Sequence, residues 1–129
     1  MEQKLPSFHD YELVGIDSSN LPVLILALQG IGRTKHLYCQ GVELFRVSDY
    51  IKQNVISRVI VTPTDKLQSD DVKRAIIWGS SLSDTSLLIR DDAVEEYVAR
   101  IYREELHLVL LEPSWGAEVV IVCKTIQTR

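Results

Sequence analysis

The segment PVLILALQGIG, residues 22–32, decides the fold that the sequence predicts. Six consecutive apolar residues lead to a glycine-bracketed turn, Gly30–Gly32, and the return segment, Thr34–Val47, largely alternates apolar and polar residues. Two extended runs joined by a glycine turn indicate a β-hairpin. Because residues 23–28 are apolar at every position, we expect this first strand to be covered on both faces.

Further strands are predicted on both sides of this hairpin. Upstream, Phe8–Asp17 alternates well enough to form a strand. Downstream, Gly41 interrupts the alternation of the return segment, which predicts a β-bulge or a short break. Asn54–Val61 then offers another strand, which should stop at Thr62-Pro63 because proline cannot donate a ladder hydrogen bond.

Two amphipathic helices follow. The first is expected to begin at Ser69 or Asp70, either of which can act as its N-cap, and to end at Gly79. The second is expected to begin at Asp92, which suits a capping box with Glu95. Its apolar stripe has the spacing of a helix packed on a sheet and consists of Val94, Tyr97, Val98, Ile101 and Tyr102.

The chain ends in a second predicted hairpin. A short apolar piece, Leu87–Ile89, precedes the second helix, and after it Leu106–Leu111 pairs with Glu118–Cys123 across a turn at Glu112–Gly116. The last strand is apolar on both faces, so we expect it near the sheet centre, under a helix. The order of elements predicts an α+β fold, a curled, mainly antiparallel sheet of about six strands with two helices packed on it. One domain over residues 1–129 is expected.

Composition narrows the classes of function. The formal net charge is −4, and the acidic excess lies in residues 65–129, with eight Lys/Arg against twelve Asp/Glu. A nucleic-acid-binding chain normally presents a basic face, so no nucleic-acid partner is predicted, although a local basic patch assembled by folding stays open. No apolar stretch approaches the roughly 20 residues that span a bilayer, so no membrane partner is predicted. Cys39 and Cys123 lack CxxC spacing and follow no signal peptide, which predicts two buried thiols in a cytoplasmic protein.

The densest group of ionisable residues is His9–Glu12. Alternate residues of a strand point to opposite faces, so on a strand His9 would share a face with neither carboxylate. A metal site would then need His36 and His107 to be brought in by folding. The other interpretation is a strand entry in which a side chain of this group bonds nearby backbone.

Aromatic side chains are the second feature that points to binding. Tyr97 and Tyr102 fit the buried stripe of the second helix, whereas Trp115, at the predicted hairpin tip, either is an exposed contact residue or folds back over the helix. No catalytic residue, metal ligand or cofactor is predicted. The candidate binding residues are Trp115, Tyr38, Glu112, His9, Asp10 and Glu12.

Four short motifs carry a resemblance to a known group of proteins. Phe8–Leu13, Gly41-Val42, Asn54–Ile56 and the closing Pro113–Glu118 resemble a set of small uncharacterised bacterial proteins. That set opens with a Phe-His-Asp/Gly-x-Glu-Leu strand and closes on a Ser-x-Gly-Ala hairpin. Some relatives with a similar opening are regarded as immunity proteins, which bind and neutralise a toxin made by the same or a neighbouring cell. The resemblance implies a mainly β fold with added helices and no catalytic residue.

Two classes of function follow from the sequence. The first is a non-enzymatic protein-binding module, most concretely an immunity-type inhibitor that covers a basic effector or toxin with an acidic, aromatic-bearing surface. The second is a small enzyme or metal-binding protein centred on His9, Asp10 and Glu12. A homodimer formed through an exposed sheet edge is a further alternative, because an open antiparallel sheet must cover or blunt its edges.

Overall fold

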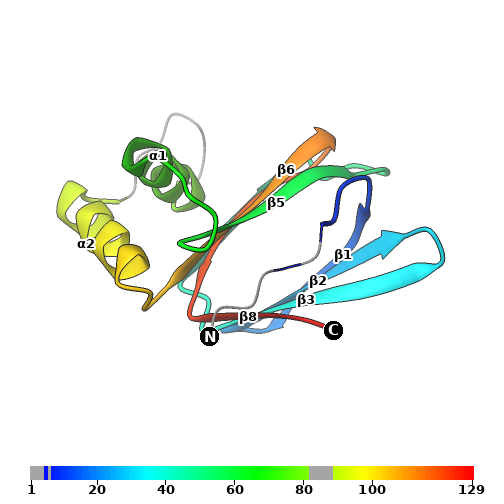
Figure 1. Cartoon of the computed structure of the whole chain (residues 1–129), viewed down its shortest axis with the longest axis horizontal. Coiled ribbons are helices and arrows are strands. Elements are labelled where there is room, and N and C mark those ends of the chain that lie inside the picture. The colour runs from blue at the N-terminus through cyan, green and yellow to red at the C-terminus, as the bar shows by residue number, and fades with distance from the viewer. Residues whose placement is uncertain (1–4, 6, 82–88) are drawn as a thin grey trace.

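The computed structural model describes residues 5, 7–81 and 89–129, and within them it contains an eight-stranded sheet and two helices (Figure 1). The elements are β1 (Glu12–Asn20), β2 (Val23–Gly30), β3 (Arg33–Gln40), β4 (Leu44–Ser48), β5 (Val55–Thr62), α1 (Ser69–Gly79), α2 (Asp91–Tyr102), β6 (His107–Trp115), β7 (Glu118–Cys123) and β8 (Thr125–Thr128). The predicted α+β class with an antiparallel sheet is confirmed. The predicted number of about six strands is wrong.

Two bends explain the difference in strand number. The strand order is β4-β7-β6-β5-β1-β2-β3-β8, every neighbouring pair is antiparallel, and the sheet is not closed. Gly41, with φ +64°, ends β3 three residues before β4 begins, and Lys124 alone separates β7 from β8. The Lys124 amide donates to the Gln40 carbonyl at 2.9 Å, so pairing continues through both bends. The predicted break at Gly41 is confirmed, and β8 was missed because its short segment is mostly polar.

The two halves of the sheet share a core between their inner faces. From β2, Leu24, Leu26 and Leu28 have no exposed surface, and they belong to the same apolar cluster as Val119 and Ile121 of β7. Each fully buried side chain of this size stabilises the fold by about 2 kcal/mol. The outward residues of β2 are only partly buried, and both helices lie on the other half of the sheet (Figure 1). The expectation that β2 is covered on both faces is therefore wrong.

The helices cover the outer face of β6 and β7. Val120 and Val122 of β7 point outward and form a second apolar cluster with side chains of both helices, whereas Val119 and Ile121 point inward. The cluster includes Val72, Ile76, Val94, Val98, Ile101, Leu106 and Leu108. The prediction that the last hairpin strand lies under a helix is confirmed, but its predicted place near the sheet centre is wrong, because β7 is second from one edge.

The helix starts differ from the prediction. The N-cap residues are Gln68 for α1 and Arg90 for α2, and neither makes a side-chain capping hydrogen bond. The predicted caps at Ser69 or Asp70, and the predicted Asp92–Glu95 capping box, are therefore wrong. Both helices instead carry two aspartates in the first turn, where the helix dipole favours negative charge.

The apolar stripe of α2 is confirmed in part. Its two valines and Ile101 are buried, Tyr97 is half-buried, and Tyr102 is 46% exposed. The Tyr102 hydroxyl donates to the carbonyl of Leu67 at 3.1 Å. The side chain of Tyr102 therefore points toward the segment before α1 and not into the apolar cluster. Of the apolar piece predicted before α2, Leu87 and Leu88 lie outside the described residues.

The two cysteines are free thiols buried in the inner core, as predicted. Hydrogen bonding between the thiols of Cys39 and Cys123, together with burial, raises the pKa of Cys39. The Cys39 thiol therefore stays protonated at neutral pH, and both cysteines pack as small apolar groups.

The final hairpin contains another correction. β6 pairs with β7 only as far as Leu111, and Glu112–Trp115 continues β6 by pairing with β5 alone. The predicted turn at Glu112–Gly116 is therefore wrong, since only Gly116 and Ala117 separate the two strands. The register between β5 and β6 shifts on both sides of Ile56, which is paired with Pro113. Such irregular positions are where a sheet tolerates proline, which has no N–H.

Candidate functional site

Three segments meet where β5 lies between β1 and β6: residues 9–12, 49–58 and 112–118, which we call the Trp115 surface. Val55 of β5 is paired with Glu12 on one side and with Trp115 on the other. The amide of Asp10 donates to the carbonyl of Ile56 at 2.9 Å, which ties the first segment to the second. Five of the six predicted binding residues lie in these segments: His9, Asp10, Glu12, Glu112 and Trp115.

The segment before β1 is a turn, whereas the sequence predicted a strand. The Tyr11 amide donates to the Phe8 carbonyl at 2.9 Å, Asp10 has φ +67°, and the Phe8 ring is buried in the core. His9 and Asp10 are therefore exposed on this turn, with His9 Nε2 3.5 Å from Asp10 Oδ2. His9 Nδ1 lies 2.9 Å from the Ser57 carbonyl, which only accepts, so Nδ1 is the donor. A side chain of this group thus bonds nearby backbone, as one of the two interpretations predicted.

The three histidines lie in three different places. His36 is on β3, and His107 on β6 makes a 3.1 Å hydrogen bond with the carbonyl of Lys124. The carboxylate of Glu12 accepts from Gln53 Nε2 at 2.9 Å. Within residues 5, 7–81 and 89–129, His, Cys, Asp and Glu form no group of three or more that could hold a metal ion.

Buried Asn54 fixes the shape of the Trp115 surface. Its Oδ1 accepts from the amides of Ile51, at 2.9 Å, and Ala117, at 3.0 Å, while its Nδ2 donates to the Ile51 carbonyl at 2.7 Å. Gly116, with φ +86°, lets the turn approach, since a Cβ there would lie 2.5 Å from Asn54 Oδ1. One amide thus locks the loop before β5 to the turn after β6. Sequence reasoning missed this residue because one of its partners, Ala117, lies 63 residues further along the chain.

Three large apolar side chains are exposed on these locked segments. Trp115 is 63% exposed, Tyr50 is 47% exposed and Ile51 is 45% exposed. The two alternatives left for Trp115 are therefore decided in favour of exposure. Sequence reasoning did not select Tyr50 or Ile51 as binding residues, although Tyr50 is an aromatic residue in a polar loop. Trp and Tyr held on a fixed backbone are typical anchors of protein–protein interfaces.

The Trp115 surface is also acidic. Its three segments hold five carboxylates against two cations, a surplus of three in a chain of formal charge −4. These residues are Asp10, Glu12, Asp49, Glu112 and Glu118, against Lys52 and Arg58. The guanidinium of Arg58 is hydrogen-bonded to Glu112, which raises the pKa of the arginine. The surface therefore attracts a partner of positive charge.

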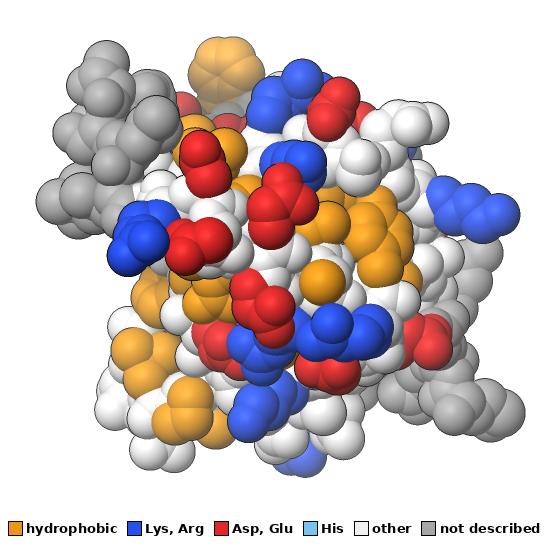
Figure 2. Space-filling view, turned by 90° about the vertical axis from the view of Figure 1, so that its left-hand side faces the viewer, with side chains coloured by type: hydrophobic (Ala, Val, Ile, Leu, Met, Phe, Trp, Pro, Cys, Tyr) orange, Lys and Arg blue, Asp and Glu red, His pale blue; other side chains and the backbone are white. Residues whose placement is uncertain are grey.

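The helical face differs from this surface, because its charges are mixed. Figure 2 shows acidic and basic side chains interspersed over the side that carries the helices. Several are paired across elements: Lys73 with Glu95 at 2.9 Å, and Arg100 of α2 with Glu43 at 2.9 Å. The acidic excess predicted for the second half of the chain is therefore partly balanced on this face.

Tyr38, the sixth predicted binding residue, lies away from the Trp115 surface. It sits on the outer face of β3, in register with Ile25 of β2 and Gln127 of β8. The guanidinium carbon of Arg129 lies 4.4 Å from the centroid of its ring, a cation–π contact. Tyr38 therefore belongs to a different, basic part of the surface.

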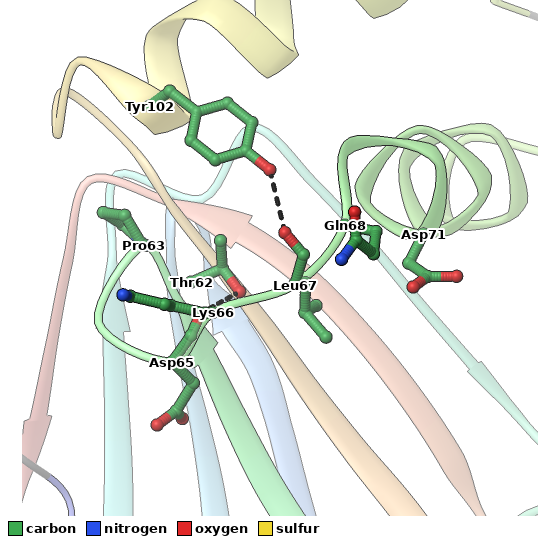
Figure 3. Close-up of a pocket in the computed structure, with 8 residues that line it drawn as sticks. All are labelled: Thr62, Pro63, Asp65, Lys66, Leu67, Gln68, Asp71 and Tyr102. Carbon is green, nitrogen blue, oxygen red and sulfur yellow. Dashed lines mark hydrogen bonds between the residues drawn. The ribbon is translucent and has the colours of Figure 1, made fainter.

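A groove of about 580 Å³ lies between the connector after β5 and the end of α2 (Figure 3). The connector is pinned, since Asp65 Oδ2 accepts from the Val61 amide at 2.8 Å and the Thr62 hydroxyl donates to the Asp65 carbonyl at 2.9 Å. No buried side-chain nitrogen or oxygen in the described part of the chain lacks a hydrogen bond. None of the polar side chains in the wall of the groove is therefore buried without a hydrogen bond. Its walls are Thr62, Pro63, Asp65, Lys66, Leu67, Gln68, Asp71 and Tyr102.

The chain matches no protein-family model, no curated protein sequence and no solved structure. None of the described helices is both long and apolar enough to cross a membrane. What the fold and the site define is an α+β chain with an antiparallel sheet and a hydrogen-bonded acidic surface that exposes Trp115.

Proposed function

We propose that this chain is a non-enzymatic protein-binding module whose Trp115 surface docks a basic protein partner. The observation that carries the proposal is Trp115 itself, 63% exposed on a backbone that buried Asn54 holds in place. A free monomer gains nothing from exposing a tryptophan together with Tyr50 and Ile51, whereas a partner gains affinity by covering them.

The fixed backbone supports this function through entropy. Binding costs about 0.5–1.5 kcal/mol for each flexible side chain or loop group that must be ordered. The hydrogen bonds of Asn54 order the loop before β5 in the absence of any partner. Affinity is then lost mainly when the anchor side chain is removed.

The charge supports a partner of a particular kind. The three segments that expose these apolar side chains hold five carboxylates, so the complementary surface carries Lys or Arg beside an apolar pocket. An immunity-type inhibitor of a basic bacterial toxin fits this description, and the resemblance of the Phe8–Leu13 opening to immunity proteins supports it. Such an inhibitor would act in the cytoplasm, bound to the toxin.

The test uses purified protein and the purified products of the genes that flank its own. Calorimetry is expected to find one basic product that binds, and Trp115→Ala is expected to weaken that binding about 30-fold or more, the loss of an interface hot spot. The matched control is Tyr102→Ala, which removes an exposed aromatic residue on the helix side and should change affinity less than about twofold. Absence of binding to every product, or binding indifferent to Trp115, would contradict the proposal.

The alternative of a small enzyme or metal-binding protein centred on His9, Asp10 and Glu12 stays a prediction. The contact between His9 and Asp10 places two ligand types side by side on an exposed turn. Elemental analysis of protein purified without chelator tests it: a stoichiometric metal ion that is lost in His9→Ala would replace the protein-binding proposal.

A further inference from the structure

β3 and β8 form a basic ribbon on the side of the sheet away from the helices. Residues 22–41 and 124–129 contain four Lys/Arg and no Asp or Glu. The cations are Arg33, Lys35, Lys124 and Arg129. Among the described residues, none of them has a carboxylate within 4.0 Å, unlike the paired cations of the helices. The four cations do not share one face, since Arg33 and Lys35 lie on the same face of β3 as the inward Leu37 and Cys39, whereas Arg129 contacts Tyr38 on the opposite face.

The ribbon ends in a free strand edge. β8 is the last strand of the sheet order and pairs with β3 alone. The His36 amide donates to the Arg129 carbonyl at 2.7 Å, and the Arg129 amide donates back to His36 at 2.8 Å. Because an antiparallel ladder uses alternate residues, Ile126 and Thr128 direct their amides and carbonyls away from β3. Neither has a backbone partner among the described residues.

This edge is short, with four residues, but it lacks other features that protect an edge strand. Thr125–Thr128 contains no charge, no proline and no register shift, and three of its four residues are β-branched. Positive charge flanks it instead, at Lys124 and Arg129. A partner strand therefore meets two amides and two carbonyls between cations.

We infer that β8 is a strand-addition site for an extended protein segment that carries carboxylates at both ends of an uncharged core. The added backbone pairs with Ile126 and Thr128, and its flanking carboxylates meet Lys124 and Arg129. A second copy of this chain, paired antiparallel through β8, would instead bring Lys124 of one copy near Arg129 of the other, which opposes association. The site is independent of the Trp115 surface and favours a partner of opposite charge.

The test follows backbone amide resonances by NMR while a capped peptide, acetyl-Glu-Thr-Val-Thr-Val-Glu-amide, is added to the full chain. The amides of Ile126 and Thr128 are expected to shift and saturate. A control peptide with Lys in place of both Glu residues is expected to bind at least about tenfold more weakly, because its ends meet Lys124 and Arg129.

A matched pair of variants separates the backbone from the side chain. Thr128→Pro removes the outward amide and leaves the hydrogen bonds to β3 intact, so peptide affinity is expected to fall about tenfold or more. Thr128→Val keeps the amide and the side-chain shape, so its affinity is expected to stay within about twofold of the parent. Arg129→Gln adds a variant that leaves the backbone unchanged and is expected to weaken binding of the acidic peptide only.

Four results would overturn the inference. One is equal affinity for the acidic and basic peptides, and another is a Thr128→Pro variant, folded by its amide dispersion, that binds as the parent does. A third is sedimentation of the parent as a dimer that Thr128→Pro dissociates, since the occupant would then be a second copy. The last is binding of an oligo-dT strand more tightly than the acidic peptide, which would make the ribbon a nucleic-acid site.

Discussion

The Trp115 surface and the β3–β8 ribbon are built on one sheet, but they differ in charge and in what they leave exposed. The Trp115 surface has a surplus of three carboxylates, and the ribbon has four cations and no carboxylate. On the first, backbone groups are satisfied within the protein and the exposed groups are Trp115, Tyr50 and Ile51. On the second, the outward amides and carbonyls of Ile126 and Thr128 have no backbone partner among the described residues. The formal net charge of −4 is therefore the sum over regions of opposite charge.

The difference indicates two modes of recognition. The Trp115 surface offers side-chain anchors on a fixed frame, so the partner supplies a pocket. The ribbon offers backbone donors and acceptors, so the partner supplies a strand, and affinity depends less on any one of its side chains. The contacts that hold the backbone also differ between the two regions, and the following variants test this difference.

The largest effect is expected at the residue that holds the Trp115 surface together. Asn54→Ala removes three hydrogen bonds and leaves the Ala117 amide buried without a partner, so the free energy of unfolding should fall by about 3 kcal/mol. Urea denaturation measures the loss. Gln53→Ala, an exposed neighbour, is the control and should change stability by less than about 0.5 kcal/mol. A loss below about 1 kcal/mol for Asn54→Ala would show that the loop is held by other contacts.

Alanine substitutions at two glycines, one in each region, compare how rigidly the two regions are held. Gly116 and Gly41 both have positive φ, so alanine at either position costs about 1–2 kcal/mol of backbone strain. At Gly116 the new Cβ also meets the buried Asn54 Oδ1 at 2.5 Å, whereas at Gly41 it meets the flexible chain of Lys124 at 2.8 Å. Thermal unfolding is expected to rank Gly116→Ala as clearly more destabilising than Gly41→Ala. The reverse order would mean that the bend at Gly41 is more rigid than the turn at Gly116.

The two regions are expected to act independently. They share no residue, and the partners we propose for them are of opposite charge, so a saturating amount of the acidic peptide should change affinity for the basic partner by less than about twofold. Calorimetry with and without peptide measures the coupling. A change of tenfold or more would show that the two regions are coupled through the sheet.

The smallest effect concerns Asp17, which lines a hollow of about 410 Å³ with His36 and Tyr38. Hydrogen bonds from the hydroxyl and the amide of Ser19, at 2.5 Å and 2.9 Å, lower the pKa of Asp17. A lowered folded pKa stabilises the fold above the ordinary carboxyl value, and this contribution is lost as pH falls through the folded value. Ser19→Ala is expected to return the pKa toward its usual range in an NMR titration and to change stability little at neutral pH. An unchanged pKa would assign the shift to other groups.

Much of the fold was predictable because its signals are local. The alternation of Leu37 and Cys39 marked β3, the helical spacing of Val94, Val98 and Ile101 marked α2, and the apolar run Val119–Cys123 marked a strand covered on both faces. Each signal is the periodicity of apolar residues within one element, so it can be read from a short segment of the sequence. The predicted helix caps failed because capping depends on side-chain rotamers as well as on residue type.

The candidate site was predictable in its residues but not in its construction. The sequence by itself determined that His9, Asp10, Glu12, Glu112 and Trp115 are polar or aromatic residues beside strands, and it left their relation open. Only the tertiary structure decided that β5 brings them together, that Asn54 locks Trp115 outward, and that β3 and β8 gather four cations. The physical reason is that pairing partners, and therefore neighbouring charges, are set by strands far apart in the chain, for which local periodicity carries no information.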